Sequence, residues 1–87
     1  MGFFSKLFGQ KSDETKYDLT LVSYDMKNKL LVIKEVHETT CLGLKEAKDL
    51  SESTPTIIAK NKSFAEASKI KANFDKLGAV IQLTPSN

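Results

Sequence analysis

The stretch from Ser63 to Gly78 carries a complete set of helix signals and constrains the segments around it. Ser63 with Glu66 three residues later is the capping-box pattern that starts a helix, and Gly78 supplies a C-terminal stop. Apolar residues recur between these signals at helical spacing, which predicts an amphipathic helix with one buried face. The members of that face are Phe64, Ala67, Ile70, Phe74 and Leu77.

Strand patterns lie on both sides of this helix. The segments 17–24 (YDLTLVSY) and 79–83 (AVIQL) alternate with the period of two that is typical of a half-buried strand. In the second of them we expect Ile81 to face the core and Val80 to face outward. A further candidate strand, 56–60 (TIIAK), follows Pro55. Together these segments predict a small three-stranded sheet.

The segment 29–39 (KLLVIKEVHET) is ambiguous. Its unbroken run from Leu30 to Ile33 favours a strand by propensity. On a helix, however, its apolar residues cover one arc of roughly 160° at 100° per residue. We interpret the segment as a helix. Because the arc is wider than one core face requires, we expect part of it to contact a partner.

A second helix is predicted over 44–50 (LKEAKDL). The elements then follow the order strand–helix–helix–strand–helix–strand. This order predicts a small α+β domain, with three helices on one side of a three-stranded antiparallel sheet.

Size and charge limit the function. The chain has 87 residues, enough for one domain. At this length folding hides only about 60–65% of the surface of the open chain, so a deep active site is not expected. The net charge of +2 is too small to indicate nucleic acid by itself. Lys62, Lys69 and Lys76 lie near one face of the predicted third helix. No aromatic residue is interleaved on that face, and Glu66 and Asp75 dilute the charge, so we expect no direct nucleic-acid binding.

The chain contains one cysteine, Cys41, and one histidine, His37. A structural zinc site needs four ligands, and a Cys–His nucleophile pair needs an orienting group and an oxyanion hole. We therefore expect no metal, no cofactor and no catalytic residue, and we interpret Cys41 as a semi-buried turn residue. A single cysteine also excludes an internal disulfide and fits a reducing compartment.

The chain divides into a Phe-rich head (1–9), a polar linker (10–16) and a compact domain (17–87). On a helix, the large apolar side chains of the head fall within about 140° and form an amphipathic segment. Weak docking of this head on a membrane or a partner, and packing of the head on its own domain, both stay open. The apolar residues of the head are Phe3, Phe4, Leu7 and Phe8.

The sequence also indicates a location. No apolar run approaches the roughly 20 residues that span a bilayer. The N-terminus lacks the pattern of a secretory signal peptide. We expect the chain in the cytoplasm, with a peripheral position at the membrane face if the head binds lipid.

The run from Lys29 to Pro55 (KLLVIKEVHETTCLGLKEAKDLSESTP) closely resembles the C-terminal domain of the bacterial large-subunit ribosomal stalk protein, the seven/twelve protein. In that family a valine- and isoleucine-rich helix ends in a basic residue, and a glycine-containing turn and lysine–glutamate–alanine–lysine follow. The string LGLKEAKDL, 42–50, is unbroken here. The resemblance extends from about Tyr17 to Leu83 and is far more specific than a short motif. It implies the fold predicted above for residues 17–87.

The resemblance also implies a function. The family's domain recruits translational GTPases to the ribosome through its first two helices and performs no chemistry. A glycine there would let a partner backbone approach closely, Ile33 and Leu44 would anchor the partner, and the lysines would speed encounter with an acidic surface. The alternative is an adaptor that reuses this fold outside the ribosome and is tethered by the head. The positions that correspond to the family's contact surface are Lys29, Leu30, Ile33, Lys34, His37, Gly43, Leu44, Lys45, Glu46 and Lys48.

The chain departs from the family at three positions and upstream. His37 stands where the family usually has arginine, so a permanent bidentate donor becomes a pH-dependent one. Cys41 replaces the first glycine of the turn, and Ser51 replaces an apolar residue late in the second helix. The family's N-terminal dimerisation domain and alanine-rich hinge are not recognisable in this sequence. Whether the chain attaches to the ribosome by the family's usual route therefore stays open at this point.

Overall fold

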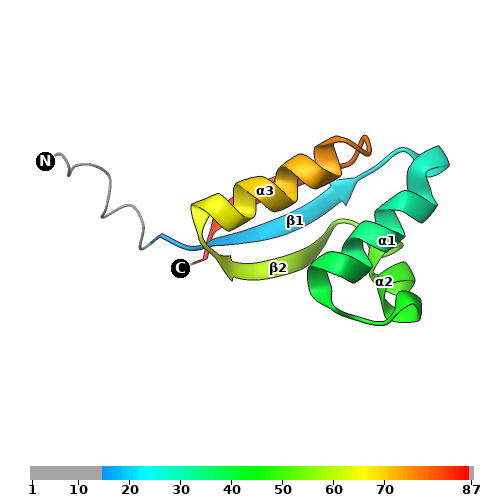
Figure 1. Ribbon diagram of the computed structural model, residues 1–87, viewed down its shortest axis with the longest axis horizontal. Helices are drawn as coiled ribbons and strands as arrows, with labels where there is room; N and C mark the ends of the chain where they lie inside the picture. The colour runs from blue at the N-terminus through cyan, green and yellow to red at the C-terminus, as the bar shows by residue number, and fades with distance from the viewer. Residues whose placement is uncertain (1–14, 87) are drawn as a thin grey trace, which may run out of the picture.

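The structure is a computed structural model that describes residues 15–86. The Phe-rich head and residues 10–14 of the linker lie outside the described residues, so the predictions for them are not tested by this structure. Figure 1 shows the arrangement of the elements. In chain order they are β1 (Tyr17–Ser23), the short 3-10 helix η2 (Met26–Asn28), α1 (Lys29–Thr40), α2 (Leu44–Ser51), β2 (Thr56–Lys62), α3 (Phe64–Asp75) and β3 (Val80–Pro85).

The three strands form one antiparallel sheet in the order β2-β1-β3. In Figure 1, α3 lies above the sheet and runs along it, and the α1–α2 pair lies at the lower right, near one end of the sheet. Contacts agree with this view, since α3 packs on β1 and β3 while α1 and α2 pack on β2. The predicted α+β fold, with its order of strands and helices, is confirmed.

The ambiguous segment forms helix α1, as predicted. Its buried side chains are Val32, Ile33 and Val36, which lie on one side of the helix. Leu30 and Leu31 remain exposed, at 80% and 52% of their surface. The apolar arc is thus wider than the core face. The exposed leucines, however, lie at the start of the helix, and Ile33 is covered by the core.

Helix α3 begins and ends at the predicted signals. Glu66 N donates to Ser63 Oγ (3.2 Å), and Ser63 N donates to Glu66 Oε1 (3.3 Å), which completes the capping box. At the other end Gly78 adopts φ 74°, a left-handed conformation that suits glycine. The chain then turns directly into β3, where Ile81 is buried and Val80 is exposed, as expected.

One hydrophobic core fills the space between the sheet and the helices. Phe74 of α3 is its largest fully buried side chain. The other buried apolar residues are Leu19, Leu21, Val32, Ile33, Val36, Ala47, Ile58, Ala59, Ala67, Ala79 and Ile81. Most of these side chains come from segments that the sequence assigned to core faces. None of the helices in residues 15–86 is long and apolar enough to cross a membrane.

Candidate functional site: the surface of the α1–α2 hairpin

Helices α1 and α2 form a hairpin whose turn has a fixed geometry. Cys41 N donates to His37 O (2.9 Å) and ends α1 in a left-handed conformation, with φ 63°. Thr40 Oγ1 donates to Val36 O (2.7 Å) and accepts from Leu42 N (3.2 Å). The polar groups of the turn are therefore hydrogen-bonded to one another. Cys41 is exposed, so the prediction of a semi-buried side chain is wrong.

His37 is part of this turn. Its Nδ1 lies within hydrogen-bond distance of Leu42 O. Because a carbonyl oxygen only accepts, Nδ1 carries the proton in this contact. In the neutral ring that leaves Nε2 as a hydrogen-bond acceptor for any partner. Where the family's arginine would present several donors, His37 presents a donor at Nε2 only when the ring is protonated.

Gly43 is the N-cap of α2, and Ala47 N donates to its carbonyl (2.9 Å). A Cβ placed on Gly43 would lie 2.7 Å from Glu46 Oε1. The space beside Gly43 is therefore taken by this chain's own glutamate. That carboxylate sits on the end of a flexible side chain, so a partner backbone that approaches Gly43 would have to move it.

An ion-pair cluster joins the two helices at the open end of the hairpin. Glu52 Oε2 lies 2.6 Å from Lys29 Nζ and 3.0 Å from Lys48 Nζ. The hydrogen bonds from Lys29 and then Lys48 lower the pKa of Glu52. The hydrogen bond to Glu52 raises the pKa of Lys29. The sequence analysis missed Glu52, although its i,i+4 spacing from Lys48 was a usable signal.

The cluster divides the four predicted lysines into two classes. The carboxylate of Glu52 partly neutralises Lys29 and Lys48. Lys34 and Lys45 are exposed and make no ion pair with any residue in 15–86. A partner would therefore meet most of the available positive charge at Lys34 and Lys45.

The apolar part of the surface differs from the one expected. Ile33 is only 7% exposed and belongs to the core, so the prediction that it projects outward is wrong. Its side chain occupies space between α1 and the rest of the core, which periodicity within α1 could not reveal. Leu44 is 59% exposed, and Leu30 is 80% exposed. These two leucines, on α2 and α1, are the accessible apolar members of the predicted surface.

Ser51, where the family has an apolar residue, is completely buried. Its hydroxyl donates to Lys48 O (2.9 Å), and its carbonyl accepts from the hydroxyl of Tyr24 (3.0 Å). The polar atoms of this buried residue are thus paired. Ser51 fastens the end of α2 to the segment after β1, and its side chain is not available to a partner.

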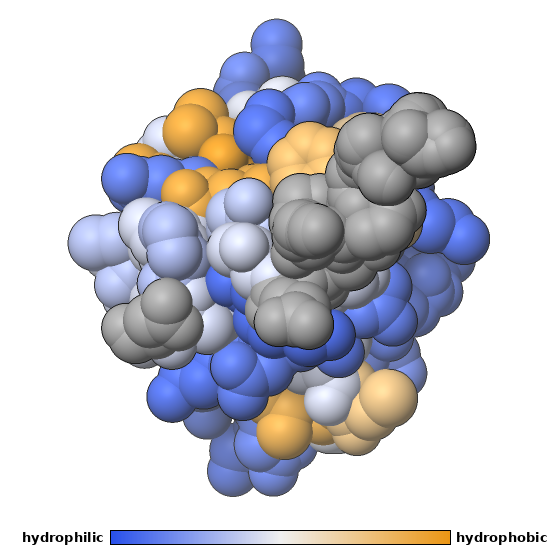
Figure 2. Space-filling model, turned by 90° about the vertical axis from the view of Figure 1, so that its left-hand side faces the viewer, coloured by the Kyte–Doolittle hydropathy of each residue, from blue (hydrophilic) through white to orange (hydrophobic). Residues whose placement is uncertain are grey.

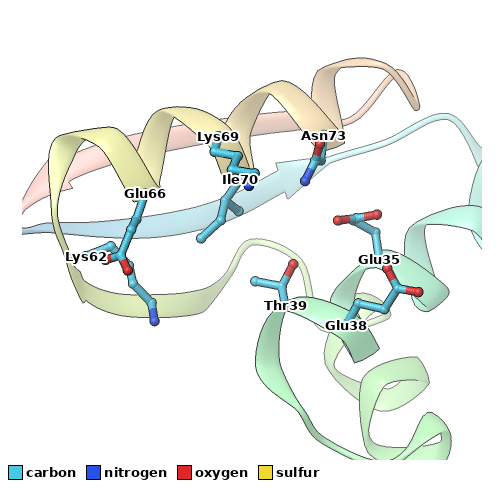
Figure 3. Close-up of a pocket in the computed structure, with 8 residues that line it drawn as sticks. All are labelled: Glu35, Glu38, Thr39, Lys62, Glu66, Lys69, Ile70 and Asn73. Carbon is cyan, nitrogen blue, oxygen red and sulfur yellow. The ribbon is translucent and has the colours of Figure 1, made fainter.

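A groove of about 420 Å³ lies between α1 and α3 (Figure 3). Glu35 and Glu38 line it from α1, while Lys62 and Lys69 line it from β2 and α3. It contains none of the ten predicted contact residues. No group of three or more His, Cys, Asp or Glu side chains in residues 15–86 could hold a metal ion. The α1–α2 hairpin therefore stays the candidate site.

Comparison with known proteins shows the family of the chain. The family model for the ribosomal protein L7/L12 C-terminal domain matches residues 17–84. The chain belongs to this family. The L7/L12 match covers β1 through most of β3, and therefore includes every residue of the candidate site.

Among the curated relatives are large ribosomal subunit proteins bL12. Those of Coxiella burnetii and Parvibaculum lavamentivorans are 42% and 46% identical over 71 residues, and one from Buchnera aphidicola is 44% identical. These alignments cover 82% of this chain and 56% to 57% of the relatives. The chain thus aligns with a little more than half the length of the bL12 proteins it matches.

Proposed function

We propose that this L7/L12-type domain is a non-catalytic binding module that contacts a protein partner through the α1–α2 hairpin, and that the partner is a translational GTPase. The relatives are proteins of the large ribosomal subunit, which supports action at the ribosome in the cytoplasm. The tether to a membrane or larger assembly would depend on the head, which lies outside the described residues.

One observation carries the proposal. Leu30 and Leu44 are exposed at opposite ends of a hairpin that also presents Lys34 and Lys45, whose ammonium groups make no ion pair with residues 15–86. Exposed apolar side chains and positive charges on one hairpin suit a partner surface that combines acidic groups with apolar contacts. The leucines would slow dissociation, and the lysines would speed association.

The test measures association of the full chain with purified elongation factors at low salt. Lys45→Glu reverses an exposed charge on the hairpin and is expected to lower the association rate about tenfold. Lys69→Glu makes the same charge change on α3 and is the matched control, with little expected effect. Equal rates for the two variants, or no binding by the unaltered chain, would contradict the proposal.

A further inference from the structure

An apolar groove lies between β2 and the turn of the α1–α2 hairpin. Its volume is about 390 Å³, and it is lined by Thr40, Leu42, Leu50 and residues 57–60 of β2. Leu42 and Ile57 are 38% and 45% exposed, although both belong to this apolar lining. Large apolar side chains gathered in one open groove indicate a surface suited to an apolar occupant.

The groove also borders an edge of the sheet. In the order β2-β1-β3, strand β2 pairs with β1, and within residues 15–86 no other strand pairs with it. An edge strand has backbone N–H and C=O groups that are not used by the sheet. A short segment lying there would find both apolar side chains and backbone hydrogen-bonding groups.

We propose that this groove binds the Phe-rich head of the same chain, residues 1–9. The head brings large apolar side chains that match the lining, namely Phe3, Phe4, Leu7 and Phe8. Lys60 is the only charged residue among those that line the groove, and the linker carries two lysines beside Asp13 and Glu14, so charge neither favours nor opposes the contact. The match between the head and the groove is therefore apolar.

The length of the linker permits this contact. Lys62, at the end of β2, lies opposite Tyr17, at the start of β1. The groove residues 57–60 therefore begin two residues from the point where the chain enters the sheet. From Lys62 to Ile57 is about 17 Å along a strand. The residues 9–14 can span about 20 Å when extended.

Hydrophobic surface is visible at this end of the molecule. Figure 2 views the molecule from the end where β1 begins, and hydrophobic atoms are exposed at its upper left and at its lower side. The lower side is the one on which Figure 1 places β2 and the α1–α2 turn. A tethered segment also has an effective concentration of the order of millimolar, so a weak contact is enough to keep it docked.

Docking of the head would place it next to the hairpin surface. Leu42 of the groove directly precedes Gly43 and Leu44, which belong to that surface. A head held there is also withdrawn from lipid. The docking itself does not depend on which partner the hairpin binds, so it can be tested on the chain alone.

Cys41 provides the probe, because it is the only cysteine in the sequence, is exposed and adjoins Leu42. A nitroxide spin label on Cys41 of the full chain should broaden the amide NMR signals of residues 3–8. Ile57→Asp puts a charge in the groove and should restore most of their intensity. Val80→Asp is the matched control, since Val80 is 52% exposed on β3 and outside the groove, and it should leave the signals broadened.

Two further measurements make the test decisive. The double variant Phe4→Ser/Phe8→Ser, studied without a spin label, should shift the amide signals of Leu42 and Ile57. This measurement tests the contact in a chain that the nitroxide cannot have disturbed. Mixing isotope-labelled chain with spin-labelled, unenriched chain detects contact between two copies. The proposal is overturned if broadening occurs only in that mixture, if Ile57→Asp and Val80→Asp behave alike, or if the serine variant leaves the groove signals unchanged.

Discussion

Cys41 occupies a backbone conformation that suits glycine. Its φ of 63° lies in the left-handed region, where the Cβ of an L-residue approaches the following carbonyl oxygen. The same position carries a glycine in the family that the sequence resembles. The hydrogen bonds of the turn hold Cys41 in this conformation despite the cost.

Replacing Cys41 with glycine should therefore stabilise the domain. The left-handed conformation costs about 1–2 kcal/mol for an L-residue, and glycine removes this cost. Glycine also raises the conformational entropy of the unfolded chain, which offsets part of the stabilisation. We expect a net increase of about 0.5–1 kcal/mol in the free energy of unfolding, measured by chemical denaturation.

Asn61 is the control for this change because its φ is 56°. Asparagine tolerates the left-handed region better than most residues do, so Asn61→Gly should gain less. A Cys41→Gly variant less stable than the unaltered chain would show that the cysteine side chain makes a contact that outweighs the backbone strain.

At the scale of elements, the hairpin depends on a contact that neither helix can make alone. Glu52 follows α2 directly, yet it pairs with Lys29 at the start of α1 and with Lys48 of α2. The carboxylate closes the open end of the hairpin, while the hydrogen bonds around Cys41 close the other end. The ion pairs of Glu52 and the hydrogen bonds around Cys41 together fix the relative position of Leu30 and Leu44.

The Glu52 cluster should make the stability of the hairpin depend on pH. The lysines hold the pKa of Glu52 below its ordinary value, so folding favours the charged carboxylate. The stabilisation is complete above about pH 4.5 and is lost as the pH falls through the lowered pKa of the folded state. Glu52→Gln should thus be less stable than the unaltered chain at neutral pH. The difference should shrink in acid, as followed by denaturation at several pH values.

Glu38→Gln serves as the matched control, because Glu38 is exposed on α1 and makes no ion pair with residues 15–86. We expect its stability to follow that of the unaltered chain across the acid range. If the free energy of unfolding of Glu52→Gln also follows that of the unaltered chain at every pH, the cluster contributes nothing to folding.

For the whole molecule, one core residue contributes a large part of the free energy of unfolding. Phe74 is the largest fully buried side chain, and it belongs to the cluster that joins sheet and helices. A domain of this size has a free energy of unfolding of only about 4–11 kcal/mol. The loss of one large core side chain can therefore remove much of the total.

Phe74→Ala should lower the free energy of unfolding by about 3–5 kcal/mol. Phe64→Ala is the control. Phe64 starts the same helix but is 62% exposed, so its predicted place on the buried face is wrong. Its ring makes a T-shaped contact with Tyr17, with centroids 5.8 Å apart. The free energy of unfolding of the control should fall much less, by about 0.5–1.5 kcal/mol for the loss of the aromatic pair. Thermal or chemical unfolding of the two variants checks this, and equal losses would show that Phe74 does not dominate the core.

Local signals accounted for most of the fold. Ser63 and Glu66 act on each other three residues apart, and Gly78 acts on the residues just before it, so each end of α3 could be predicted from a local signal. The period of two placed Ile81 inside and Val80 outside for the same reason. The helical arc of 29–39 identified α1, although its propensity favoured a strand.

The candidate surface was predicted less completely. Periodicity placed both Ile33 and Leu30 in one apolar arc, but only the packing of the core decided that Ile33 is covered and Leu30 is not. The pairing of Glu52 with Lys29 joins residues 23 positions apart in the sequence, and the groove beside β2 brings Leu42 next to Ile57.

The sequence by itself thus determined the elements, their order and the family, because those follow from interactions between near neighbours along the chain. The tertiary structure decided which apolar side chains stay exposed, which lysines form ion pairs with Glu52 and where a groove opens. Those properties depend on distances between segments far apart in the sequence, and they exist only once the helices have packed on the sheet.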